Sequence, residues 1–301
     1  MTWTADDLPD LTGTTAVVTG ANSGIGRSVA RELATHGATV VLACRSVERG
    51  RAATLGMPGT TRVEPLDLAS QASVHAFARR WEGPLDLLVN NAGVMWPPTW
   101  RETGDGFELQ YGTNHLGHFA LTGLLLPALL EAPAPRVVSV ASIAHHHGNA
   151  SVLEGNPRQG YFPERAYGNT KLANVLFFRE LHRRATATDS PLVSTAAHPG
   201  VAATNLVTSP DGLGRLKPVR ALAPYVMRAL FQSADAGADP ILYAATEAEP
   251  GTYWGPRRLR ESRGPVGPAR LSRWAQDDEL ARQLWQRSVE QTGVEYTLLK
   301  D

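Results

Sequence analysis

Short runs of apolar and β-branched residues alternate along the chain with longer stretches in which apolar residues recur every three to four positions. The short runs are bounded by turn residues, which is typical of strands buried in a parallel sheet. Six of them predict strands at 14–19, 38–43, 61–65, 85–89, 136–140 and 192–197. The longer stretches predict helices at 25–35, 70–81, 107–130 and 166–184. Because strand and helix alternate this regularly, we expect a doubly wound α/β fold, whose parallel sheet is covered by helices on both faces.

The rhythm changes after Pro199. Residues 205–231 are rich in glycine and proline at their start and then carry apolar residues at roughly helical spacing. Open α/β sheets bind ligands beyond the carboxyl ends of their strands, so we interpret 205–231 as a helical substrate lid; a core helix or a subunit contact explains the same apolar stripe. We expect one domain over residues 1–301, with a C-terminal extension at about 257–301. The remaining predicted elements are a helix at 234–247, a strand near 252–254, an irregular segment at 257–270 and a helix at 277–291.

The composition narrows the function classes. The 29 basic and 29 acidic residues balance, so the chain lacks the positive charge expected of a nucleic-acid binder. Cys44 is the one cysteine, which excludes an intrachain disulfide and favours the cytoplasm over an oxidising compartment. The first residues lack the order of a signal peptide, and the apolar stretch 116–130 is interrupted and too short to span a bilayer. We therefore expect a cytoplasmic protein with neither a membrane nor a nucleic-acid partner.

A glycine-rich turn joins the first predicted strand to the first predicted helix. Glycine lets the backbone turn tightly and approach a phosphate, and the free N–H groups at the start of a helix favour its negative charge. A glycine-rich turn alone is weak evidence, but its position between strand and helix indicates a dinucleotide pyrophosphate site. The residues expected to bind the cofactor here are Gly20, Asn22, Ser23, Gly24, Ile25 and Gly26.

The Gly-x-x-x-Gly-x-Gly spacing of this turn resembles that of the short-chain dehydrogenase/reductase family. In that family the residue after the second strand selects the cofactor, because an acid there accepts from the adenosine ribose and an arginine suits a 2′-phosphate. Here the strand ends in Cys44-Arg45-Ser46, with no acid before Glu48. The resemblance therefore implies NADP(H) in preference to NAD(H), with Arg45 as the phosphate ligand. The alternative is that Arg45 is a solvated surface residue.

Further segments agree with the resemblance. The pair Asp67-Leu68 follows the third strand, where family members contact the adenine ring, and Asn90-Asn91-Ala92-Gly93 ends the fourth, where they line the cofactor floor. The segment 199–204 resembles the family segment whose threonine contacts the nicotinamide carboxamide. Taken alone, each is also typical of an ordinary strand-ending turn. The cofactor contacts implied are Asp67, Leu68, Asn91, Ala92, Gly93, Pro199, Gly200 and Thr204.

A phenol and an amine stand four residues apart in Tyr167-Gly168-Asn169-Thr170-Lys171, within the helix predicted at 166–184. This spacing places both on one helix face, and a plain surface pair is the alternative. An unperturbed phenol has a pKa near ~10, so a nearby ammonium is expected to favour the phenolate and bring proton exchange toward neutral pH. The resemblance implies that Tyr167 is the general acid or base and that Lys171 also binds the nicotinamide ribose.

Two more polar residues complete the site that the resemblance implies. A serine after the fifth strand hydrogen bonds the substrate oxygen in family members, which implies Ser142 in preference to Ser139, a residue inside the strand. Asn114, in the segment Thr-Asn-His-Leu-Gly-His-Phe, matches the family asparagine that bends a helix and holds a water relaying protons to the lysine. A buried polar residue that bonds to backbone is the alternative for Asn114.

The resemblance spans about residues 14–253 and is closest to the retinol-dehydrogenase-like branch of the family. It implies hydride transfer between NADP and a carbonyl or alcohol of an apolar small molecule, and a homodimer or homotetramer. Vertebrate members often carry a membrane anchor, which we do not expect here. Two other functions stay open: reduction of a conjugated carbon–carbon double bond, and NADP sensing without turnover. The run His145-His146-His147 matches no strong metal-ligand spacing and predicts a loop beside the substrate pocket.

Overall fold

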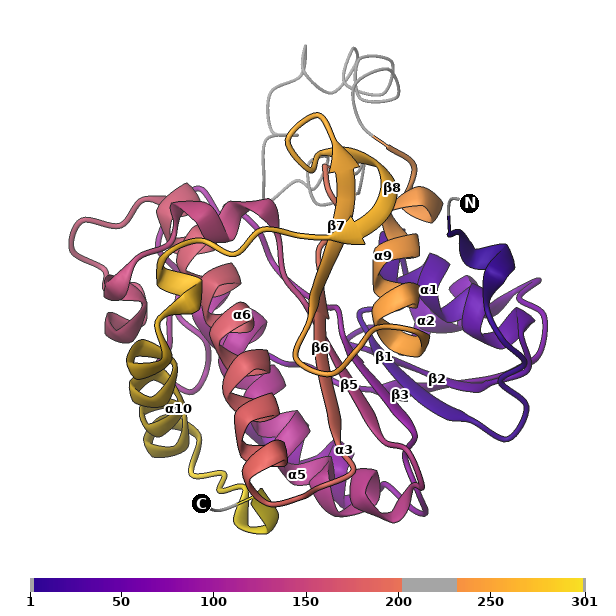
Figure 1. Ribbon diagram of the computed structural model, residues 1–301. Coiled ribbons are helices and arrows are strands. Elements are labelled where there is room, and N and C mark those ends of the chain that lie inside the picture. Colours follow the sequence, from indigo (N-terminus) through magenta and orange to yellow (C-terminus); the bar gives the residue numbers. More distant parts are fainter. Residues whose placement is uncertain (1–2, 202–231, 300–301) are drawn as a thin grey trace.

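Eight strands form one sheet in the order β3-β2-β1-β4-β5-β6-β7-β8 in the computed structural model, which describes residues 3–201 and 232–299 (Figure 1). Neighbouring strands from β3 to β7 pair in parallel, and β8 pairs with β7 in the antiparallel sense. The six strands predicted up to residue 197 are confirmed, with every end within two residues. The strands are β1 Thr15–Thr19, β2 Thr39–Cys44, β3 Thr60–Pro65, β4 Leu87–Asn90, β5 Arg136–Val140, β6 Val193–Ala197, β7 Tyr253–Arg258 and β8 Arg263–Pro268.

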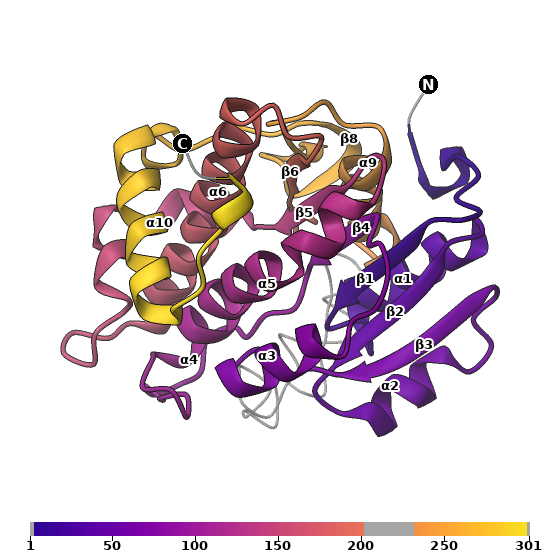
Figure 2. The same cartoon turned by 90° about the horizontal axis from the view of Figure 1, so that it is seen from below.

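Helices cover both faces of this sheet, as the alternation of strand and helix predicts (Figure 2). The main helices are α1 Gly24–Thr35, α2 Val47–Thr54, α3 Gln71–Arg79, α4 Leu109–Tyr111, α5 Gly117–Glu131, α6 Pro163–Ala187, α9 Ala234–Thr246 and α10 Asp278–Thr292. A π-helical turn spans Gly112–Leu116. Short 3-10 turns lie at Ala5–Asp7, Ile143–His147, Ala150–Glu154, Trp274–Gln276 and Thr297–Leu299.

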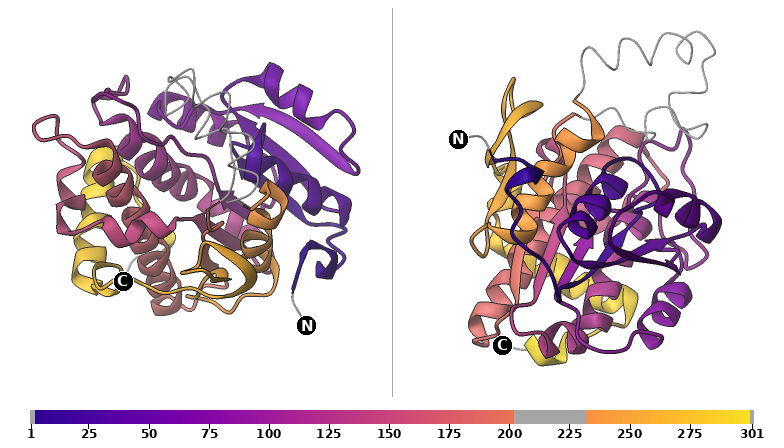
Figure 3. Two further views of the ribbon diagram at one scale, coloured as in Figure 1. Left: turned by 90° about the horizontal axis from the view of Figure 1, so that it is seen from above. Right: turned by 90° about the vertical axis from the view of Figure 1, so that its right-hand side faces the viewer.

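Alternation along the strands assigns each buried side chain to one of the two faces. In β1, Ala16 and Val18 pack in a cluster with α1 and α9, whereas Val17 between them packs in a second cluster with α3, α5 and α6. Successive side chains of a strand point to opposite faces, so a strand that is apolar at every position is buried on both. Figure 3 gives the same layers from above and from the side. The predicted α/β fold is therefore confirmed in the described residues.

The prediction of an irregular segment at 257–270 is wrong. Strand β7 continues to Arg258, and β8 returns beside it as an antiparallel hairpin at the sheet edge. The sequence Arg-Gly-Pro-Val-Gly-Pro of β8 has little intrinsic strand preference, because glycine and proline are both depleted in strands. Pairing with the exposed edge of β7 supplies the order that the local sequence lacks.

The helix predicted at 107–130 is interrupted. The short helix α4 leads into the π-helical turn and only then into α5, which carries Pro127 near its end. A π-turn has one extra residue per hydrogen-bonded ring and recurs at functional sites. Here it holds Asn114 fully buried. Helix α2 was not predicted, since its sequence has few apolar residues to mark a buried face.

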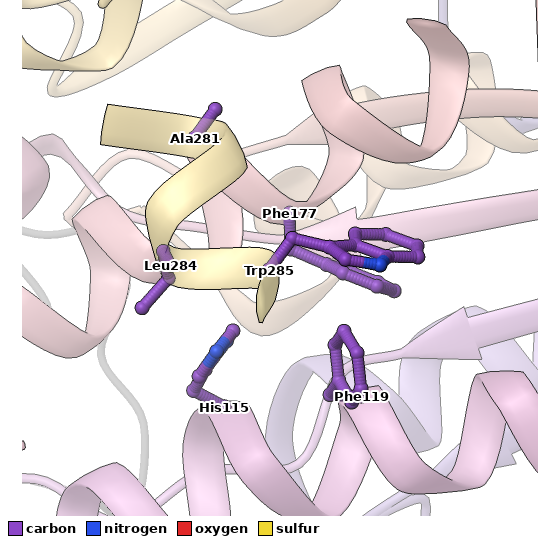
Figure 4. Close-up of a pocket in the computed structure, with 6 residues that line it drawn as sticks. All are labelled: His115, Phe119, Phe177, Ala281, Leu284 and Trp285. Carbon is purple, nitrogen blue, oxygen red and sulfur yellow. The ribbon is translucent and has the colours of Figure 1, made fainter. Parts of the chain in front are cut away.

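The C-terminal helix α10 lies against α6 and closes an aromatic cluster between it and α5 (Figure 4). The rings of Phe177 and Trp285 stack with their centroids 5.8 Å apart, and Phe119 meets Trp285 edge-on at 5.0 Å. The helix predicted at 277–291 is thereby confirmed as an integral part of this face of the fold. The substrate lid predicted at about 205–231 lies outside the described residues. Within those residues, no helix has the length and apolarity needed to cross a membrane.

Candidate active site

The glycine-rich turn packs closely against the residues that follow β4. Gly20 follows β1 at φ +66°, and a Cβ placed on it would lie 2.9 Å from the Cα atom of Ala92. A Cβ on Gly26 would run into the Asn91 side chain and lie 2.8 Å from the Gly20 carbonyl oxygen. These four residues, Gly20, Gly26, Asn91 and Ala92, form what we call the glycine cradle. It fits a dinucleotide, because only backbone this free of side chains lets a pyrophosphate approach so closely.

The start of α1 completes the cradle. Asn22 and Ser23 form the turn, Gly24 begins the helix at φ +56°, and Ile25 packs into the core. Ser23 precedes the helix in extended backbone, and its side chain makes no capping hydrogen bond. Helix N-terminal N–H groups that no side chain caps are the groups that bind phosphate oxygens. The structure therefore brings the predicted pyrophosphate residues together at one helix end.

Thr19, which the sequence reasoning did not single out, ties the two sides of the cradle together. Its hydroxyl oxygen accepts hydrogen bonds from the backbone N–H groups of Asn91 and Ala92, both at 2.9 Å. The Asn91 side-chain amide donates in return to the Thr19 carbonyl oxygen at 2.8 Å. A polar residue that ends a buried strand directly before a glycine turn is the signal that could have found it.

The residues expected to recognise the adenosine end follow β2 and β3. Arg45 is exposed directly after Cys44, at the same edge of the sheet as the glycine turn. Asp67 is partly buried, and one of its carboxylate oxygens accepts from the backbone N–H of Ala69 at 3.0 Å. Leu68 is buried, and a Cβ on Gly117 would run into its carbonyl oxygen. Among residues 3–201 and 232–299 the exposed Arg45 side chain has no hydrogen-bond or ion-pair partner, so it is available to a ligand from solvent.

Ser142, Tyr167 and Lys171 converge beyond the carboxyl end of β5. The Tyr167 hydroxyl and the Ser142 side chain are hydrogen-bonded to each other. The Lys171 ammonium lies 5.7 Å from the centroid of the Tyr167 ring and donates to the Val140 carbonyl oxygen at 3.0 Å. Ser139 is buried within β5. We call Ser142, Tyr167, Lys171 and the neighbouring Asn114 the polar cluster.

Burial sets the protonation of this cluster. It raises the pKa of Tyr167 to about 12, while the hydrogen bond with Ser142 acts in the opposite direction. It lowers the pKa of Lys171 to about 8, because the interior disfavours the charged ammonium. Burial thus raises the pKa of Tyr167, whereas the sequence predicts that the nearby Lys171 ammonium lowers it. At neutral pH this arrangement holds a protonated phenol, which is a proton donor.

Asn114 links the cluster to the segment that follows β4. Its side-chain oxygen accepts from the Val94 N–H at 2.7 Å, and its amide donates to the Val94 carbonyl oxygen at 2.9 Å and to Thr170 at 3.2 Å. A Cβ on Gly93 would lie 3.2 Å from the Asn114 side-chain oxygen and 3.8 Å from the Lys171 nitrogen. The side chain therefore makes the backbone bonds of a buried polar residue; the water relay stays a prediction.

His118, also missed from the sequence, carries the connection further. One ring nitrogen lies 3.0 Å from the Asn114 carbonyl oxygen and the other 2.9 Å from the Thr19 hydroxyl. Burial lowers the pKa of His118 to about 4, so the ring is neutral at physiological pH. A neutral ring has one donor and one acceptor nitrogen, which matches a carbonyl on one side and a hydroxyl on the other. His118 thus joins the π-helical turn to the cradle.

The segment after β6 is described only in part. Gly200 has φ +66°, and its N–H donates to His198 at 3.2 Å; a Cβ there would lie 2.7 Å from a ring carbon of Pro256. Pro199 precedes it at the carboxyl edge of the sheet, and Thr204 lies outside the described residues. His145 is buried and lies 2.7 Å from the Ser142 carbonyl oxygen. Over residues 3–201 and 232–299, no group of three or more side chains has the arrangement of a metal site.

Comparison with known sequences places these features in a family. A family model described as short chain dehydrogenase matches residues 14–211. The polyprenol dehydrogenase of Mus musculus is 41% identical over 301 residues, covering 95% of this chain and 86% of that protein. Retinol dehydrogenase 13 of Homo sapiens is 39% identical over 292 residues, covering 94% of this chain and 86% of that protein.

Solved structures share the fold. The crystal structure of an uncharacterized protein from Mycobacterium paratuberculosis is 45% identical, with a TM-score of 0.84, and covers 98% of this chain and 99% of that chain. A protein from Beutenbergia cavernae, described as an NAD(P)-dependent gluconate 5-dehydrogenase with bound NADP, is 25% identical with a TM-score of 0.59. That match covers 79% of this chain and 92% of the other.

Proposed function

The chain belongs to the short-chain dehydrogenase/reductase family, whose members are oxidoreductases that bind a nicotinamide cofactor, and we propose that it interconverts a carbonyl and an alcohol on an apolar small molecule with NADP(H). One observation carries the proposal: the hydrogen-bonded pair Ser142 and Tyr167 meets Lys171, and the Lys171 nitrogen would lie 3.8 Å from a Cβ on Gly93, the residue after the cradle. When bound, the nicotinamide supplies or accepts the hydride. The protein's own part is to orient the substrate oxygen and to move a proton to or from it.

Tyr167 is the proton donor in reduction. As hydride reaches the carbonyl carbon, the carbon–oxygen double bond becomes an alkoxide, and the phenolic proton passes to that oxygen. Ser142 donates a hydrogen bond to the same oxygen and shares its developing charge. The Lys171 ammonium stabilises the phenolate that remains. In oxidation the steps reverse, and Tyr167 removes the hydroxyl proton.

Arg45 supports the choice of NADP(H). It is exposed at the carboxyl end of β2, and a guanidinium forms paired, charge-assisted bonds to a phosphate that an acid would repel. The Beutenbergia cavernae structure of the same fold holds NADP. The names of the relatives, polyprenol and retinol dehydrogenases, refer to apolar alcohols, which favours an apolar substrate.

A screen of NADPH oxidation against aldehydes, ketones and conjugated enones tests the proposal, with Tyr167→Phe as the control. We expect turnover of apolar carbonyls that is lost with the phenol. Saturation of the enone double bond in preference to carbonyl reduction would assign the protein a different reaction. Tight NADPH binding without turnover of any substrate would favour a sensor. Carbonyl reduction that survives in Tyr167→Phe would overturn the mechanism.

A further inference from the structure

Trp96 has a backbone conformation that its side chain disfavours. It follows the cradle residues Asn91 and Ala92 by a few positions and has φ +55°, in the left-handed region that favours glycine. Large side chains are rare there, because the Cβ crowds the backbone. Its indole N–H is buried and has no hydrogen-bond partner in the described part of the chain, which is a second cost. A strained backbone conformation persists only where the surrounding structure holds it in place. Such residues concentrate at functional sites.

The indole of Trp96 borders the proposed proton donor. Its ring meets the ring of Tyr167 nearly at a right angle, 79°, with the centroids 6.4 Å apart. A carbonyl oxygen within hydrogen-bond reach of the phenol, about 2.6–3.2 Å, brings the substituents of its carbon into the space around both rings. The residue in the unfavourable conformation is therefore also the neighbour of the reacting group.

Gln110 hydrogen bonds to the Trp96 backbone in this conformation. Its side-chain oxygen accepts from the Trp96 backbone N–H at 2.9 Å, and its amide nitrogen donates to the Pro163 carbonyl oxygen at 3.2 Å. Pro163 is the first residue of α6, the helix that carries Tyr167. Gln110 is fully buried, so one amide fixes the position of Trp96 relative to the start of that helix.

A second layer of hydrogen bonds fixes the orientation of Gln110. Its amide nitrogen also donates to the Tyr161 hydroxyl at 3.0 Å, and that hydroxyl donates to the Glu108 carboxylate at 3.1 Å. Glu108 is buried and accepts further hydrogen bonds from the Tyr111 N–H and from Asn156. A flipped Gln110 amide would place its NH₂ group against the Trp96 N–H, donor against donor. The network therefore permits one orientation, which is the one that holds Trp96.

We propose that Trp96 determines substrate specificity: its indole is the wall beside the phenol that excludes substrates with branches next to the carbonyl carbon. Gln110 is the positioning residue that keeps the wall in place. The inference rests on the proposed function, since it requires a carbonyl oxygen to meet Tyr167. The proposed function requires only an apolar carbonyl substrate. The Trp96 wall further restricts the shape of that substrate next to its carbonyl carbon.

Hexanal and its α,α-dimethyl derivative are the matched probes, because they differ only in bulk beside the carbonyl. The test variant is Trp96→Gly, since glycine adopts φ +55° without strain. We expect the ratio of kcat/KM for the branched aldehyde to that for hexanal to rise at least about tenfold in Trp96→Gly. Trp96→Phe keeps an aromatic wall and should change the ratio by less than about threefold. Gln110→Leu should raise the same ratio by a smaller factor than Trp96→Gly, because the indole is still present but no longer held in place. The affinity for NADPH should be unchanged.

Leu259→Gly is the control for relief of strain. Leu259 has φ +50° and is exposed in the β7–β8 turn, far along the chain from Tyr167. In Leu259→Gly, the ratio of kcat/KM for the branched aldehyde to that for hexanal should equal the wild-type ratio. If Trp96→Gly does not fold, Trp96→Asn replaces it, because asparagine also tolerates left-handed backbone.

The outcomes separate this inference from the proposed function. Wild-type turnover of hexanal with a ratio that is unchanged or lower in Trp96→Gly overturns the role of Trp96 alone. An equal loss on both aldehydes also overturns it, because it shows a general structural effect. A wild-type protein that reduces neither aldehyde overturns the proposed function, and the inference with it.

Discussion

The two sides of the candidate active site are built by opposite means. The glycine cradle is made of missing side chains, since a Cβ on Gly20 or Gly26 would collide with neighbouring residues. The polar cluster is made of buried side chains, with Asn114 fully buried and Lys171 only 4% exposed. The first side depends on the shape of the backbone, and the second on which polar atoms it buries. Added bulk should therefore damage the cradle, whereas removal of polar atoms at constant shape should damage the cluster.

The largest effect is expected in the polar cluster. Ser142→Ala removes the hydroxyl that pairs with Tyr167 and should lower kcat/KM for carbonyl reduction about 100-fold or more, because a donor to the developing oxyanion is lost. Ser139→Ala is the matched control, since Ser139 is buried inside β5 with no hydrogen-bond partner for its hydroxyl in the described chain. Equal losses in the two variants would show that Ser142 has no special role.

The cradle should respond to a single added methyl group. Gly26→Ala places a Cβ against the Asn91 amide and the Gly20 carbonyl, and overpacking of this kind costs about 1–3 kcal/mol. We expect NADPH binding, measured by calorimetry, to weaken by at least about tenfold. Gly104→Ala is the control, because a Cβ there meets nothing within 4 Å. Unchanged NADPH affinity in Gly26→Ala would remove the cradle from the account.

The polar cluster should also reduce the stability of the fold. The folded-state pKa of Lys171 is lowered to about 8 from 10.5, so between these values the unfolded chain binds more protons and stability rises with pH. At neutral pH the charged form is the one that burial penalises. Lys171→Met should therefore raise the free energy of unfolding by about 2 kcal/mol near neutral pH, and the gain should shrink as the pH rises through that window.

Urea unfolding at a neutral and an alkaline pH measures this difference. The same substitution should abolish turnover, so stability and activity move in opposite directions. A Lys171→Met variant that is less stable than the wild type at neutral pH would show that the hydrogen bond to Val140 outweighs the burial of charge.

The smallest effect concerns cofactor choice. Arg45→Asp places a negative charge where the 2′-phosphate is proposed to bind, and should weaken NADP binding about tenfold more than NAD binding. Arg51→Asp makes the same change of charge at an exposed position of α2 and should alter both affinities equally. Equal weakening of NADP and NAD in Arg45→Asp contradicts the assignment.

Local sequence predicts the cradle better than the cluster. The glycine turn and the strand ends are marked by residues adjacent in the chain, and their positions are confirmed. The hydrogen bonds of the cluster join residues far apart in the chain, such as Asn114 to Val94 and Lys171 to Val140. The spacing of Tyr167 and Lys171 marks that pair in the sequence, but Ser142 and Asn114 are implied only by the resemblance. No periodicity along the chain predicts the distant partners of these residues.

The same distinction explains the errors in the fold. Strand β8 is held by pairing with β7, and the π-helical turn by contacts of Asn114 with Val94 and Thr170. Both depend on tertiary context that overrides local preference. The left-handed backbone of Trp96 has no signal in the local sequence either, and Gln110, which accepts a hydrogen bond from its N–H, lies 14 positions further along the chain.

The rate of hydride transfer in a single turnover, followed against pH, tests most directly whether the Tyr167 phenol moves the proton. Burial raises its pKa to about 12, so carbonyl reduction should be level through neutral pH, and alcohol oxidation, which needs the phenolate, should rise with pH. In Tyr167→Phe, both rates should fall by about 100- to 10,000-fold, and the rise should disappear. A Tyr167→Phe variant that binds NADPH and oxidises alcohol with the wild-type rate and pH dependence would contradict the account.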